Sequence, residues 1–223
     1  MQQVAIDGLF NVRATGSDAP WLVRSGATEG ITRRGADELR RLGVSVVVDL
    51  REPDEAGVVA HGIRVLPVPV YGTPPPRAGR IEDIYAGLLR ERGGALARAV
   101  AHIAGAERAA LVHCTAGKDR TGLVIALARG AAGASDDEIV DDYAASAAEV
   151  RAAREEAAQR MAHSATGDER AEILRLHLES PPEAIAHALS IVAERGGAAA
   201  YLAAHGVTGA QLDALRRKHE AAR

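Results

Sequence analysis

The chain has 223 residues, of which 47% are hydrophobic and 26% are charged, and its formal net charge is −3. This length suits one large domain, so we expect a single domain over residues 1–223, and a monomer. The small net charge and the 3% content of aromatic residues argue against nucleic acid as a partner. The sequence has no apolar stretch of about eighteen residues that could span a membrane, and no signal peptide is recognisable. Cytoplasm is the default location, with export without a signal peptide left open.

From the N-terminus, the first predicted element is a short strand at residues 21–24. Thr32 is a typical N-cap and Gly43 a typical helix stop, which predicts a helix over residues 32–42. Residues 44–50 (VSVVVDL) form a nearly continuous β-branched run, typical of a strand buried on both faces of a parallel sheet. Residues 63–70 predict a further strand, and its two prolines place it at an edge or fraying into a loop.

Residues 71–80 contain three consecutive prolines and predict a loop. A helix follows over residues 81–104, with a break expected at Gly93 and Gly94. Then come a strand and a helix, and from Ser135 the chain is predicted to be helical almost throughout. These later elements are residues 109–113 (strand), 120–132 (helix), and helices beginning at Ser135, Pro181 and Thr208. The alternation predicts an α/β fold with a central, mostly parallel sheet flanked by helices.

Residues 111–122 (LVHCTAGKDRTG) have the order strand, tight loop, helix. At such a junction the loop amides and the first helical turn point inward, and the helix dipole adds positive potential, which suits an oxyanion. Gly117 lets the backbone turn where a Cβ would obstruct it. The loop is therefore a predicted phosphate site that requires neither a metal ion nor a cofactor.

Cys114 and Arg120 supply the predicted chemistry. Cys114 is the only cysteine, which excludes an intramolecular disulfide and a multi-cysteine metal site. Its positive surroundings favour the thiolate, which is the nucleophilic form. Arg120 lies near the helix start, where its planar fork can hold two phosphate oxygens. Because phosphoryl transfer needs a positioned nucleophile and charge stabilisation, the pattern indicates a cysteine-dependent phosphatase and not a buried structural cysteine.

The segments HCTAGKDRTG, VVDLREPDE, DDEIVDDY and YLAAHGVTGAQLDALRR together resemble the bacterial tyrosine phosphatase family that includes mycobacterial protein tyrosine phosphatase B. The likeness runs from about Asn11 to Arg217 and is most specific in the loop. It implies a cysteine phosphatase-like fold and a helical lid over residues 148–180. It also implies phosphorylated protein or phosphoinositide as substrate and inorganic phosphate as product.

The resemblance assigns a role to each loop residue. Cys114 becomes the nucleophile, Thr121 donates a hydrogen bond to its thiolate, and His113 tunes the cysteine from behind. Phosphate is bound by Arg120 and by the loop, whose residues are Thr115, Ala116, Gly117 and Lys118. Lys118 has two interpretations: a second cation at the pocket, as in loops that accept inositol lipids, or a side chain that faces solvent.

The general acid is open from sequence alone. Related phosphatases use an aspartate on a separate mobile loop, but here Val70 and Tyr71 follow the corresponding strand. Asp119 is the first candidate because it must lie beside the pocket, although it could instead buttress the loop. Asp83 is the alternative, and its position at a helix start also suits a role at the helix N-terminus.

Other charged residues are predicted to support the loop. Asp49, Arg51 and Glu55 end a strand beside the site and are expected to form a partly buried ion-pair network. Asp142 and its neighbours are expected to pack behind the loop, whereas the partner of Arg13 stays open because Ala14 follows it.

Phosphotyrosine is the first expected substrate, with phosphoserine, phosphothreonine and phosphoinositides as further candidates. Two other functions compete with this one. A phosphatase fold that binds phosphorylated partners without turnover would also keep such a loop. A rhodanese-like sulfurtransferase also places a cysteine before a helix, but its loop usually lacks the GKDRT ending.

Overall fold

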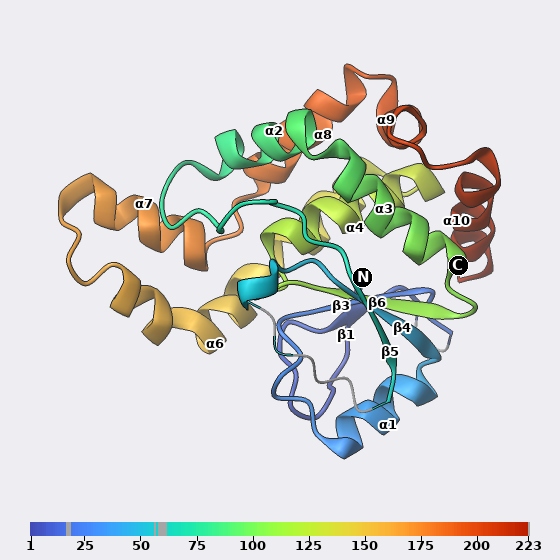
Figure 1. Ribbon diagram of the computed structural model, residues 1–223, viewed down its shortest axis with the longest axis horizontal. Helices are drawn as coiled ribbons and strands as arrows, with labels where there is room; N and C mark the ends of the chain where they lie inside the picture. Colours follow the sequence, from blue (N-terminus) through green and yellow to red (C-terminus); the bar gives the residue numbers. More distant parts are fainter. Residues whose placement is uncertain (17–18, 56, 58–61, 223) are drawn as a thin grey trace.

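A computed structural model describes residues 1–16, 19–55, 57 and 62–222. Its centre is a six-stranded sheet with helices on both faces (Figure 1). The strands are β1 (Gln2–Gln3), β2 (Arg13–Ala14), β3 (Leu22–Ser25), β4 (Val44–Asp49), β5 (Arg64–Pro67) and β6 (Ala109–His113). The helices are α1 (Arg33–Arg41), η1 (Pro53–Glu55), α2 (Ile81–Glu91), α3 (Gly93–Gly105), α4 (Asp119–Ala132), α5 (Asp136–Ala144), α6 (Ser146–Met161), α7 (Gly167–Leu178), α8 (Pro182–Ala193), α9 (Gly197–Ala204) and α10 (Gly209–Ala221).

The strand order is β1-β2-β3-β6-β4-β5. Neighbours from β3 to β5 run parallel, whereas β1 and β2 add an antiparallel edge. The expected mostly parallel sheet is therefore confirmed. Because β6 lies between β3 and β4, the segment that leaves β6 emerges at the middle of the carboxyl edge, where parallel α/β sheets place their ligand sites.

Burial on both faces explains the unbroken apolar run of β4. Val47 packs into the cluster that α1 covers, together with Val23 and Leu111 of the neighbouring strands. Val46 and Val48 belong to the larger cluster on the opposite face, which the other helices cover. Figure 1 shows α1 alone on one side of the sheet and α3 and α4 on the other. A strand enclosed in this way needs hydrophobic residues at consecutive positions.

The helix boundaries follow the predicted start and stop signals. The Thr32 side chain accepts a hydrogen bond from the amide of Gly35, and Ser135 and Thr208 each form a capping box. The helix expected over residues 81–104 is interrupted at Arg92, next to the two glycines, and becomes α2 and α3. Most of the helical C-terminal region lies with α2 to α4 on the large-cluster face of the sheet.

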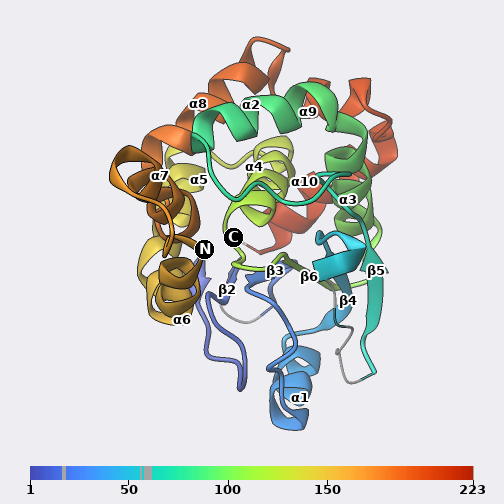
Figure 2. The same cartoon turned by 60° about the vertical axis from the view of Figure 1, so that its left-hand side comes forward.

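The pair α6 and α7 projects at one end of the molecule (Figures 1 and 2). The two helices pack on each other through a small cluster of their own, formed by Ala162, Ala165 and Ile173. In the described part of the chain, no helix has the length and apolar character needed to cross a membrane.

Candidate active site

The loop between β6 and α4 forms the floor of a cavity of about 190 Å³. Cys114 follows directly after β6, is 2% exposed and lines this cavity. Thr115, Ala116, Asp119 and Arg120 line the same cavity. The structure thus brings the predicted nucleophile, the predicted phosphate ligand and the first candidate acid together at one site.

Gly117 allows the loop to pass under β3. Its φ is +68°, and a Cβ at this position would lie 2.2 Å from the carbonyl oxygen of Ser25. Asn11 Nδ2 donates to the carbonyl oxygens of Ala116 and Gly117 at 3.0 and 3.1 Å, and Arg24 Nη2 donates to that of Gly117 at 2.7 Å. In a trans peptide the N–H points opposite to the preceding C=O. These contacts therefore turn the amides of Gly117 and Lys118 away from Asn11.

Asn11 and Arg24 are held by a buried charge network. Asp142 of α5 accepts from Arg13 Nε at 2.7 Å and from Arg24 Nη1 at 2.5 Å, and Arg13 Nη1 donates to Asn11 Oδ1. Burial alone would raise the pKa of Asp142, but the two arginines outweigh it and lower that pKa well below its usual range. Asp142 thus packs behind the loop, as expected, and it is the partner of Arg13.

Arg120 is oriented by Glu55 of η1. Its two Nη atoms donate to the two carboxylate oxygens of Glu55 at 2.5 and 2.8 Å, and Thr115 Oγ1 donates to Oε1 at 2.7 Å. Burial would raise the pKa of Glu55, but these hydrogen bonds lower it to about 2. The Tyr71 ring lies against the guanidinium, 4.8 Å from Cζ to the ring centroid. The Glu55 carboxylate therefore holds Arg120. Glu55 joins the expected network of Asp49 and Arg51 through its backbone carbonyl oxygen, which accepts from Arg51 Nη1 at 3.4 Å.

Asp49 and Arg51 form the expected buried pair, with Arg51 Nη2 at 2.9 Å from Asp49 Oδ2, and Glu29 completes it through Arg51 Nη1. His113 Nε2 lies 3.7 Å from the same Asp49 oxygen, and its Nδ1 lies 3.3 Å from the Cys114 carbonyl oxygen. Burial lowers the pKa of His113 more than Asp49 raises it. His113 is therefore neutral at neutral pH and sits behind the cysteine.

The two candidate acids occupy different places. Asp119 lines the Cys114 cavity, and its Oδ1 accepts from the Tyr85 hydroxyl at 2.8 Å and lies 2.8 Å from Lys118 Nζ. The Asp83 side chain is 76% exposed on α2, lies 3.6 Å from Arg80 Nε and does not line this cavity. Of the two candidate acids, Asp119 therefore lies at the Cys114 cavity and Asp83 does not.

Lys118 is fully buried, so the expectation that its side chain faces solvent is wrong. Its ammonium donates to the carbonyl oxygens of Leu176 and Glu179 at 2.9 and 2.7 Å, at the end of α7. The side chain is directed to that helix and does not line the cavity. Thr121 is also fully buried, and its Oγ1 makes no hydrogen bond with any described residue, including Cys114.

The cavity walls come from the loop of residues 71–80, which we call the proline-rich loop, and from α6 and α7. Among the wall residues are Pro75, Pro76, Arg77, Arg154, Met161, Leu176 and His177. Arg77 and Arg154 add positive charge around Arg120, which favours an anionic ligand. In the described residues, no group of three or more histidine, cysteine, aspartate or glutamate side chains is placed to hold a metal ion.

Asn11, Arg24 and Tyr85 are among the residues of this site that were not identified from the sequence. Arg24 lies in a predicted strand, and Tyr85 lies in a predicted helix where an aromatic residue is ordinarily core. Asn11 adopts φ +54°, a conformation that asparagine tolerates better than most residues. The signal available in the sequence was Asn11 itself, a loop residue two positions before Arg13, whose partner the sequence left open.

The fold and the site define a class: a cysteine and an arginine on one loop, at the carboxyl edge of a parallel sheet, mark the cysteine-dependent phosphatases. The sequence profile of the tyrosine phosphatase family matches residues 5–219, and the chain belongs to that family. A solved structure, the catalytic core of Siw14, is similar to 78% of this chain and 95% of its own, with 19% identity and a TM-score of 0.46. Among curated proteins, none matches the chain.

Proposed function

We propose that this protein hydrolyses phosphate monoesters, with phosphotyrosine as the first substrate, through a phosphocysteine at Cys114. The observation that carries the proposal is the shared cavity of Cys114, Arg120 and Asp119. The Cys114 sulfur attacks phosphorus, the bond to the ester oxygen breaks, and Asp119 gives that oxygen a proton. Water then attacks the phosphocysteine, returning a proton to Asp119 and releasing inorganic phosphate.

Electrostatics supports the first step. The hydrogen bonds from Asn11 and Arg24 fix the backbone of the loop, and Glu55 holds Arg120, so the loop and the guanidinium are positioned before the substrate arrives. Preorganised donors around a developing oxyanion are the largest contribution to catalysis in many enzymes. Arg77 and Arg154 extend the positive potential to the cavity mouth and favour entry of a dianionic ester.

Residues 148–180 are proposed to act as a lid. Arg154 and Met161 of α6 and Leu176 and His177 of α7 line the cavity above the loop. This region therefore contributes walls to the site while packing as a separate helix pair. Such an arrangement suits a cover that controls access to a buried nucleophile.

The first experiment is hydrolysis of para-nitrophenyl phosphate and phenyl phosphate across pH. We expect Cys114→Ser to abolish turnover of both, because the phosphocysteine cannot form. Asp119→Asn should lose the alkaline limb of the kcat/KM profile and should slow phenyl phosphate far more than the nitro compound, whose leaving group hardly needs a proton.

Asp83→Asn is the matched control for the acid, and we expect it to retain both rates and the alkaline limb. Loss of that limb in Asp83→Asn, with Asp119→Asn unaffected, would contradict the assignment of Asp119. A wild type that binds phosphotyrosine but turns over neither ester faster than Cys114→Ser would show a phosphate-binding module instead. Transfer of sulfur from thiosulfate to cyanide would indicate a sulfurtransferase.

A further inference from the structure

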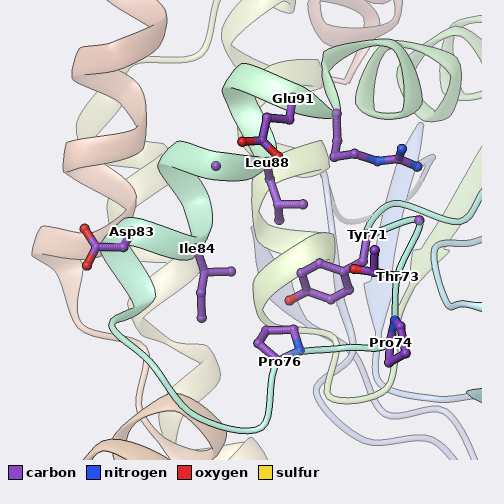
Figure 3. A pocket seen from close by; sticks show the side chains of 11 residues that line it. Tyr71, Thr73, Pro74, Pro76, Asp83, Ile84, Leu88 and Glu91 are labelled. Atoms are coloured by element: carbon purple, nitrogen blue, oxygen red, sulfur yellow. The ribbon is translucent and has the colours of Figure 1, made fainter.

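A second, larger cavity of about 480 Å³ lies between α2 and the proline-rich loop (Figure 3). We call it the α2 groove. Its apolar part consists of Ile84 and Leu88 on one side and Tyr71 and Pro76 on the other, and Figure 3 shows these four side chains directed into the same space. Ile84 and Tyr71 are half-buried, so the groove leaves apolar surface accessible.

Gly87 keeps the groove open on the α2 side. No heavy atom lies within 4 Å of the Cβ position that a side chain would occupy there. Glycine in a helix interior costs about 1 kcal/mol relative to alanine, so nothing in helix formation favours it at this position. The absence of a side chain instead leaves room for one supplied by a ligand.

The groove adjoins the active site. Tyr71 and Pro76 line both cavities, and the Tyr71 ring also packs against the Arg120 guanidinium. A chain that places a phosphorylated side chain on Arg120 therefore passes Tyr71 on its way out. The adjoining residues of such a chain would enter the α2 groove.

Two acidic side chains line the groove. Asp83 and Glu91 line it, and Glu91 forms no ion pair in the part of the chain that the structure describes. Asp83 Oδ2 forms an ion pair with Arg80 Nε at 3.6 Å. Arg92 also lines the groove, and its Nε donates to the Val70 carbonyl oxygen at 2.8 Å. Glu91 is thus the carboxylate most available to a ligand, and its complement is a lysine or arginine.

We propose that the α2 groove binds the polypeptide segment next to the phosphotyrosine of a protein substrate. An apolar side chain of that segment fills the space beside Gly87, between Ile84 and Tyr71, and a basic side chain faces Glu91. This inference rests on the proposed phosphatase activity and narrows its substrate class to phosphoproteins. A small phosphorylated molecule or a lipid headgroup has no segment to place there.

The test compares kcat/KM for phosphotyrosyl peptides in which each flanking position in turn carries lysine, leucine, alanine or glutamate. Wild type should prefer lysine over glutamate at one or two positions by about two- to fivefold, the strength of an exposed ion pair. Glu91→Lys should reverse that preference. Glu107→Lys is the matched control. Glu107 lies just before the amino end of β6 and does not line the groove, so this variant should keep the wild-type preference.

Gly87→Leu tests the groove by filling it. A Cβ at residue 87 meets no heavy atom within 4 Å, and leucine has a higher helix propensity than glycine, so we expect the fold to be kept. We expect kcat/KM for the best peptide to fall about tenfold, as for loss of a well-packed interface contact, while para-nitrophenyl phosphate is hydrolysed at the wild-type rate.

The two proposals fail in different ways. No turnover of para-nitrophenyl phosphate by wild type would remove the phosphatase function itself. Turnover of that ester with no dependence on flanking residues, or with Gly87→Leu and Glu91→Lys both matching wild type on every peptide, would overturn the groove. A phosphoinositide turned over faster than every peptide, with no effect of Gly87→Leu, would also overturn it.

Discussion

Asp119 shares one carboxylate oxygen between two donors, the Tyr85 hydroxyl and the Lys118 ammonium. The Tyr85 hydroxyl also lies 2.8 Å from that of Tyr143, so a short hydrogen-bonded chain leads from the core to the candidate acid. Burial raises the pKa of both tyrosines far above the usual value, with the negative charge of Asp119 adding to it. Both stay protonated and serve as donors throughout the working pH range.

We predict that Tyr85→Phe shifts the alkaline limb of kcat/KM to higher pH by about half a unit to one unit, the effect of one neutral hydrogen bond. The sign follows because a donor favours the ionised carboxylate, so its removal favours the protonated acid. The other charged and titratable groups around Asp119 stay unchanged; they include Lys118, Arg120, Tyr71, Tyr143 and His177.

The matched control for this prediction is Tyr201→Phe. Tyr201 is equally buried and donates to the Leu89 carbonyl oxygen at 2.9 Å, away from the acid. Its loss should lower stability by a similar amount without moving the limb. If Tyr85→Phe left the limb in place or moved it to lower pH, Tyr85 would not position the acid.

At the scale of elements, α5 is joined to two strands through a single carboxylate. Asp142 binds Arg13 of β2 and Arg24 of β3, and those arginines in turn support the loop between β6 and α4. All three side chains are buried. Removing one member of a buried ion-pair network leaves uncompensated charge, which costs more than the network itself contributes.

We predict that Asp142→Asn lowers the free energy of unfolding by about 3 to 5 kcal/mol at neutral pH, measured by urea denaturation. The neighbouring Asp141→Asn is the control, since Asp141 is exposed, and should change it by less than about 0.5 kcal/mol. Because the folded pKa of Asp142 is lowered, its contribution is present above about pH 4 and is lost as pH falls. The gap between wild type and variant should therefore narrow in acid; a constant gap would contradict the ionic origin.

At the scale of the whole molecule, the α6–α7 pair is tied to the catalytic loop through Lys118. Its ammonium binds the carbonyl oxygens at the end of α7. The α6–α7 pair and the loop between β6 and α4 are therefore linked by direct hydrogen bonds, and the position of α7 depends on a residue of that loop.

We predict that deleting residues 150–179 raises kcat/KM for bulky phosphopeptides relative to para-nitrophenyl phosphate, because the upper wall of the cavity is removed. The deletion should also lower stability, since Lys118 loses two buried acceptors. Met161→Ala is a milder variant that opens the cavity mouth and keeps those acceptors. It should raise the same ratio without the loss of stability; unchanged ratios in both variants would remove the lid assignment.

The sequence by itself determined the parts whose signals are local. The β-branched run at residues 44–50, the caps at Thr32, Ser135 and Thr208, and the order of residues in HCTAGKDRTG each depend on neighbours in the chain. These signals are sufficient to predict a parallel sheet and a phosphate-binding loop at its carboxyl edge.

Only the tertiary structure decided which distant residues meet. It paired Glu55 with Arg120, Arg13 with Asp142 and Tyr85 with Asp119, and it buried Lys118 under α7. It also showed that Asp83 lies in the wall of the α2 groove and not in the cavity of Cys114. The physical reason is that a charged or polar side chain can satisfy its hydrogen bonds with many partners of suitable chemistry. Which of them it meets depends on the packing of elements far apart in the sequence.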